Sequence, residues 1–178
     1  MEIDAEIYIP IKQAFDSNDL VAFRRLLGEH PQYLRDVRDG TDWWMWKAAM
    51  DGNLPIVQTL IDLGLRPNES QDLPDPEDPD FLFVQVEGPI LQAAGQGHFD
   101  VVAYLLEQGA QINYEISGKV RCLPLLRAAT KGHLEVVKLL VEHGADLNFT
   151  FNGHTPVSQA DDYGHAEVAA YLRSVGAK

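Results

Sequence analysis

The feature that most constrains this chain is an internal repeat. Three segments align without gaps: "PILQAAGQGHFDVVAYLLEQGAQIN" at 89–113, "PLLRAATKGHLEVVKLLVEHGADLN" at 124–148 and "PVSQADDYGHAEVAAYLRSVGAK" at 156–178. Two looser segments fit the same pattern: "WMWKAAMDGNLPIVQTLIDLGLRPN" at 44–68 and "PIKQAFDSNDLVAFRRLLGEHP" at 10–31. A unit this short cannot bury its apolar side alone, so the chain must fold as a stack in which each unit covers the next.

Each unit has the spacing of two short helices. Leu125, Ala128 and Ala129 lie at i, i+3 and i+4, which gives the first helix one narrow apolar face. Val136 and Leu140 give the second helix a similar face. Gly132 between them predicts the turn, because glycine tolerates the positive φ that such turns require.

The repeated residues closely resemble the ankyrin repeat, whose pattern places Gly-His between two helices and Gly-Ala-Asp after the second. The Gly-His pairs here are Gly97-His98, Gly132-His133 and Gly164-His165, and the resemblance covers nearly the whole chain. It implies an all-α ankyrin-repeat solenoid that binds other proteins. We expect a single domain over 1–178, with about five helix-turn-helix repeats near 8–35, 41–68, 88–113, 123–148 and 155–178.

Smaller signals mark the ends of helices and the turns. Pro10, Pro89, Pro124 and Pro156 fall where a first helical residue would lie, and Thr155 is placed to cap its helix. His98, His133 and His165 recur at the repeat period, too far apart to share a metal ion, so we expect hydrogen bonds within their turns. The recurring Asn113 and Asn148 are expected to stabilise the loops in the same way.

One linker is much longer than the others. From Gly52 to Gly97 is 45 residues, against a period of about 33. The excess at 69–87 contains seven acidic residues, no basic residue and the proline-rich run "PDPEDPD". "FLFVQV" follows, a composition that favours a strand. We predict an extended acidic loop or hairpin that either contacts a partner or only makes the protein more soluble.

All three tryptophans lie in "TDWWMWKAAMDG". In the repeat alignment Met45 takes the buried leucine position, and we expect Trp44, Lys47 and Asp51 to point to the inner-helix surface, with Trp46 at a seam between repeats. Exposed tryptophan is enriched at binding hot spots. The alternative is that Trp43 and Trp44 pack against Phe81 and Phe83 as an additional small core.

Net charge and motifs narrow the function. With 14 basic and 27 acidic residues the net charge is −13, which disfavours nucleic acid and anionic membranes and favours a basic protein partner. The N-terminus lacks a secretory pattern and the single cysteine, Cys122, fits a reducing compartment, so we expect a cytoplasmic protein. Neither a catalytic motif nor zinc-ligand spacing is present, which predicts no enzyme, no cofactor and no metal.

The leading hypothesis is a non-catalytic inhibitor, of the immunity-protein or antitoxin kind, that occludes a basic partner such as a toxin or enzyme. The alternative is an adaptor that joins two cytoplasmic proteins. On its own the chain would be a monomer or weak homo-oligomer. The expected partner-binding residues lie on the inner helices, the loop tips and the insertion: Asp42, Trp43, Trp44, Trp46, Lys47, Met50, Asp51, Asp75, Glu77, Asp78, Asp80, Phe81, Phe83, Gln96, Tyr114, Arg127, Lys131, Phe149, Phe151, His154, Asp162 and Tyr163.

Overall fold

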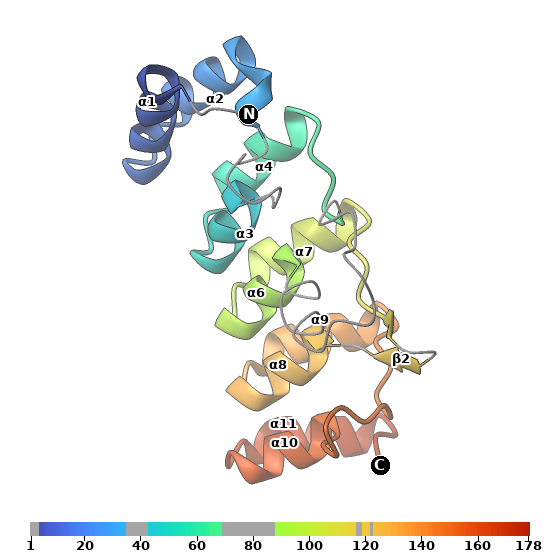
Figure 1. Cartoon of the computed structure of the whole chain (residues 1–178). Coiled ribbons are helices and arrows are strands. Elements are labelled where there is room, and N and C mark those ends of the chain that lie inside the picture. Colours follow the sequence, from blue (N-terminus) through green and yellow to red (C-terminus); the bar gives the residue numbers. More distant parts are fainter. Residues whose placement is uncertain (1–3, 35–42, 69–87, 117–118, 122) are drawn as a thin grey trace.

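Figure 1 shows helix pairs stacked one after another from the N-terminus to the C-terminus of the chain. This computed structural model describes residues 4–34, 43–68, 88–116, 119–121 and 123–178. The first helices of the pairs, here called inner helices, are α1 (Ala5–Asp16), α3 (Trp43–Met50), α6 (Pro89–Gln96), α8 (Leu123–Lys131) and α10 (Pro156–Asp162). The second, or outer, helices are α2 (Leu20–Glu29), α4 (Leu54–Asp62), α7 (Phe99–Glu107), α9 (Leu134–Glu142) and α11 (Ala166–Ser174). The all-α ankyrin-type solenoid predicted from the sequence is confirmed.

In the described parts of the chain, two small elements lie between the pairs. A single 3-10 turn, η1 (Pro31–Tyr33), follows α2. A short antiparallel hairpin of β1 (Tyr114–Ile116) and β2 (Lys119–Arg121) precedes α8, with Glu115 paired to Val120. The acidic insertion at 69–87, with the loop or hairpin predicted for it, lies outside the described residues.

The core is one continuous layer that runs between the inner and outer helices along the stack. Leu125, Ala128 and Ala129 of α8 are fully buried, and Val137 and Leu140 of α9 are buried with them. Small alanines at the inner positions let adjacent helices approach closely, and α8 lies directly against both α6 and α10. The spacing read from the sequence therefore identified the buried face correctly.

A ladder of histidines ties the later repeats together. His98 Nε2 lies 3.0 Å from the carbonyl oxygen of Met50, and His133 and His165 make the same contact with Gly95 and Thr130. Each bond joins a repeat to the one before it, whereas the sequence had predicted bonds within the turn. The difference has a steric cause: the imidazole reaches across the turn because the preceding repeat has glycine there.

Gly97 shows why that position must be glycine. Its φ is +79°, a conformation that side chains with a Cβ rarely adopt. A Cβ placed there would also lie 2.5 Å from Nδ1 of His133, which is inside van der Waals contact. Both the turn and the histidine ladder therefore depend on this glycine.

A second ladder joins the loops on the opposite edge. Asn68 donates a hydrogen bond to the carbonyl of Gly109 at 2.7 Å and accepts one from the amide of Gln111. Asn113 repeats this pattern with Gly144 and Asp146. The predicted role of the asparagines in the loops is confirmed, and the bonds connect neighbouring repeats.

The prediction that Trp44 points to the inner-helix surface is wrong; Phe81 and Phe83, its partners in the alternative prediction of an additional core, lie outside the described residues. The side chain of Trp44 is fully buried, and its indole N–H donates to the carbonyl of Tyr33 at 3.0 Å. Tyr8, Phe15 and Phe23 surround it with ring centroids 4.9 to 5.9 Å away. Trp44 occupies the position that proline takes in other repeats, and the preceding repeat covers that position; this is why the side chain faces inward.

Pro10 corrects a second prediction. It lies inside α1, which begins a full turn earlier at Ala5, whereas Pro89 and Pro156 do open their helices. The additional turn is held by Asp4, whose side chain caps the helix and whose backbone amide donates to the hydroxyl of Tyr33. The predicted cap at Thr155 is confirmed as a reciprocal capping box with Ser158.

Candidate partner-binding surface

The inner-helix surface is formed by side chains that leave the stack on the side of α3, α6, α8 and α10. In each of these helices the last residue and the residue four positions before it are exposed or half-buried, which places equivalent side chains in rows. Tyr163 is the most exposed aromatic member of the set at 62%. The members are Trp46, Lys47, Met50, Asp51, Gln96, Arg127, Lys131, Asp162 and Tyr163, each exposed or half-buried.

Charge on this surface is mixed along the stack. In α3, Lys47 forms an i, i+4 salt bridge with Asp51. Arg127 and Lys131 make α8 basic, since no acidic residue lies between Leu123 and Lys131. In α10, Oδ2 of Asp162 lies 3.7 Å from Nδ1 of His154. His154 lies in the loop before α10 and was also predicted to contact a partner. The sequence alone placed these residues on one surface, and the structure shows that its charge changes from repeat to repeat.

The loop before α10 differs from the prediction. Phe149 was expected to be at least partly exposed, but only 5% of it is accessible. Phe151 is half-buried, and its backbone exchanges two hydrogen bonds with His154 at 2.9 and 3.0 Å. Asn152 and Gly153 form the tip with positive φ, so the chain reverses there and turns Phe149 into the core. His154 remains exposed, as predicted.

Several predicted residues cannot be assigned to this surface. Trp43 begins α3 and Tyr114 begins β1. Asp42 and the predicted residues of the insertion lie outside the described residues: Asp75, Glu77, Asp78, Asp80, Phe81 and Phe83.

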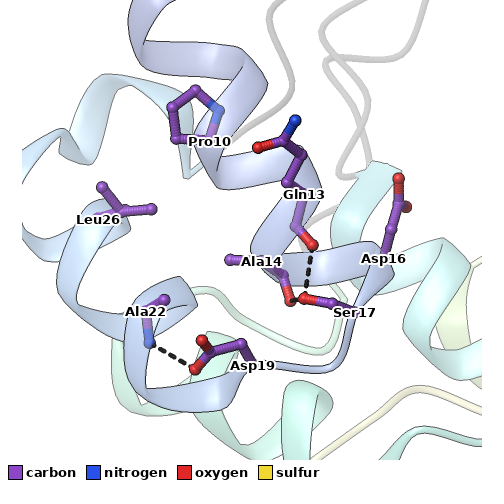
Figure 2. Close-up of a pocket in the computed structure, with 8 residues that line it drawn as sticks. All are labelled: Pro10, Gln13, Ala14, Asp16, Ser17, Asp19, Ala22 and Leu26. Carbon is purple, nitrogen blue, oxygen red and sulfur yellow. Dashed lines mark hydrogen bonds between the residues drawn. The ribbon is translucent and has the colours of Figure 1, made fainter.

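The sequence analysis missed the exposed apolar residues of the first repeat. Val21 of α2 is 81% exposed and Ile9 of α1 is 51% exposed. The same two helices form a groove, which Figure 2 shows with its lining residues. A signal for Val21 was available: the equivalent position is Asp100, Glu135 and Glu167 in the last three repeats.

Among the described residues there is no group of histidine, cysteine and acidic side chains that could hold a metal ion. In the same parts of the chain, no helix has the length and apolar character needed to cross a bilayer.

The family model for ankyrin repeats, in three copies, matches residues 90–178, which is half of the chain. The chain therefore belongs to the ankyrin-repeat family, a family of protein-protein interaction modules. The match begins with α6, and the same helix-pair architecture continues through the repeats that precede it. No curated protein matches the chain in sequence.

Proposed function

We propose that this protein is an inhibitor that covers a basic surface or cleft of a partner protein, as immunity proteins and antitoxins do. The family supports protein binding as the mode of action. The observation that carries the proposal is the row of outward side chains on the inner helices, which continues from α3 to α10 on a backbone held by two hydrogen-bond ladders. A rigid platform loses little conformational entropy on binding, which favours tight association.

The charge distribution supports a basic partner. Seven of the 27 acidic residues and none of the 14 basic ones fall in 69–87, so this segment is far more acidic than the chain as a whole. A concentrated negative segment would accelerate the approach of a positively charged partner and would lose this effect in high salt.

The test is affinity capture with the full chain, followed by measurement of the captured partner's activity and affinity. Tyr163→Ala tests the inner-helix surface, and Asp75→Asn with Glu77→Gln and Asp78→Asn tests the insertion. Glu142→Gln, at the exposed end of α9, is the control. We expect both test variants to weaken binding about tenfold or more while the control does not. An obligate partner with an acidic surface, or unaltered affinity in both variants, would refute the proposal.

A second function, an adaptor that joins two proteins, is favoured by one observation. Arg127 and Lys131 make the α8 part of the surface basic, whereas the insertion is acidic, so the two regions suit partners of opposite charge. Light scattering on a mixture of the chain and two captured partners would distinguish the functions, because an adaptor forms a ternary complex and an inhibitor does not.

A further inference from the structure

The inner-helix surface is basic at α8. Arg127 and Lys131 are both exposed, and they lie four residues apart, so they share one side of the helix. Figure 1 shows α8 between α6 and α10, and both of these helices pack against it. The exposure of the two cations therefore does not depend on what precedes α1 or follows α11.

Lys131 has no partner for its charge. Among the described residues, no carboxylate lies within salt-bridge distance of its ammonium group and no hydrogen bond is donated by it. Acidic residues of the same surface differ in this respect, because Asp51 pairs with Lys47 and Oδ2 of Asp162 lies 3.7 Å from Nδ1 of His154. The chain has 27 acidic and 14 basic residues. A cation that none of the described carboxylates contacts is available for a carboxylate from another protein.

A glycine of α6 makes room for the side chain of Arg127. Gly95 stands where other repeats have Met50, Thr130 and Asp162. A Cβ at Gly95 would lie 3.7 Å from Cβ and 4.0 Å from Cδ of Arg127, so the aliphatic stem of the arginine occupies space that a longer side chain would take. Because this contact already holds the stem, the side chain loses less conformational freedom on binding. The planar guanidinium has several N–H donors and suits a carboxylate.

Tyr163 adds a hydroxyl group in the following repeat. It takes the position that Lys131 has in its own repeat, because each of the two directly precedes the turn glycine. Tyr163 is 62% exposed, and Asp51 and Gln96 at the same position are exposed although a repeat follows each of them. Its exposure is therefore a property of this position. Tyrosine is enriched at binding hot spots, and its O–H can donate to a carboxylate.

Two cations and a hydroxyl donor in adjacent repeats match a negatively charged ligand. Resting on the proposed function, in which the inner-helix surface binds a partner, we propose that α8 binds an acidic segment of that partner. Arg127 and Lys131 contact its carboxylates, and Tyr163 donates a hydrogen bond to it. Asp162 on α10 limits the contact to α8, because like charges repel. A nucleic acid is opposed by the net charge of −13, since a long polyanion meets the whole chain, whereas a short acidic segment meets mainly α8.

The test selects binders for the full chain from a library of random linear peptides and then measures the affinity of the selected peptides in solution. Lys131→Gln removes the unpaired charge and keeps a residue that favours helices. Lys178→Gln is the matched control: Lys178 is also exposed, and its backbone amide is bonded to Asn148 on the loop edge, away from the inner helices. Tyr163→Ala reports on the inner-helix surface as a whole. Urea unfolding of each variant checks that it is folded.

We expect the selected peptides to be enriched in aspartate and glutamate, with affinity about tenfold lower in Lys131→Gln and unchanged in Lys178→Gln. The loss in Lys131→Gln should be smaller at high salt, because salt screens exposed charges. The inference is overturned if no acidic peptide is recovered, if Lys131→Gln binds as well as the natural chain, or if Lys178→Gln loses as much affinity.

Failure of this inference can be distinguished from failure of the proposed function. If Tyr163→Ala weakens peptide binding and Lys131→Gln does not, the inner-helix surface binds a ligand and only the acidic segment is wrong. The proposed function fails separately, when the captured partner protein binds equally well to Tyr163→Ala and to the insertion variant.

Discussion

The contact between the first two repeats and the contacts among the last three achieve the same stacking in different ways. At the first contact, Trp44 fills an aromatic cluster with Tyr8, Phe15 and Phe23, and the turns meet through an Asn53–Asn18 side-chain bond of 2.8 Å. At the later contacts a histidine bonds to the preceding repeat across a glycine. The family model covers only the later region. An aromatic cluster and an asparagine pair thus take the place that the histidine-to-carbonyl bonds have in the later contacts, and the helix pairs stack in the same way.

The largest effect should come from Trp44→Ala. Removing a fully buried indole leaves a cavity and an unpaired carbonyl at Tyr33, with an expected loss of about 3–5 kcal/mol of unfolding free energy. Because the cluster joins α1 and α2 to the rest, hydrogen exchange should show lost protection there and retained protection in α8 to α11. The half-buried Trp46→Ala is the control, with a clearly smaller loss. If protection from hydrogen exchange were lost equally in all repeats, the first repeat would not unfold separately from the last two, and the prediction would be wrong.

Next in size is Gly97→Ala, paired with Gly109→Ala. Both glycines have positive φ, +79° and +84°, but only Gly97 has a histidine ring against it. Gly109→Ala should cost about 1 kcal/mol from backbone strain alone, and Gly97→Ala about 2–4 kcal/mol because the ring of His133 must also move. Urea unfolding of both variants measures the difference. If the two variants lose the same stability, the ring contact contributes nothing.

Asn113→Ala should have a smaller effect. It removes two hydrogen bonds to the next loop, one to the carbonyl of Gly144 at 2.9 Å and one from the amide of Asp146. Because the site is solvent-accessible, we expect a loss of about 1 kcal/mol, measured by thermal or urea unfolding. Gln108→Ala, at the exposed end of α7, should leave stability unchanged. If Asn113→Ala leaves the free energy of unfolding unchanged, the asparagine hydrogen bonds do not stabilise the stack of repeats.

The smallest effect concerns Tyr104 at high pH. Burial raises the pKa of this phenol above its ordinary 10.0, and the carboxylates of Asp62 and Glu107 raise it further. The folded state therefore favours the neutral phenol, and this stabilisation is complete below the unfolded pKa and is lost as pH rises through the folded pKa. Unfolding measured at about pH 9 and about pH 11 should show a smaller decrease in Tyr104→Phe than in the natural chain. An identical decrease in both proteins would refute this role.

Most of the scaffold could be predicted from residues close together in sequence. The apolar spacing of Leu125, Ala128 and Ala129 located a buried helix face, and Gly132 located a turn. Exposure of aromatic residues could not be predicted in this way. Trp44 is buried by segments that lie elsewhere in the sequence. Phe149 lies between polar Asn148 and Thr150, yet it is buried where the loop reverses.

The exposed side chains divide in the same manner. The outward positions on the inner helices follow from the repeat period, so Asp51, Lys131 and Tyr163 were identified in advance. The exposure of Val21 and Ile9 was not predicted, because exposure of a side chain depends on which other segments lie against it.

The sequence by itself determined the helix pairs, their turns and their order, because these depend on contacts within one repeat and on a period that each repeat shares. Only the tertiary structure decided which aromatic side chains are buried. Burial of a side chain such as Trp44 depends on the neighbouring repeat that covers it, and no spacing within its own repeat contains that information.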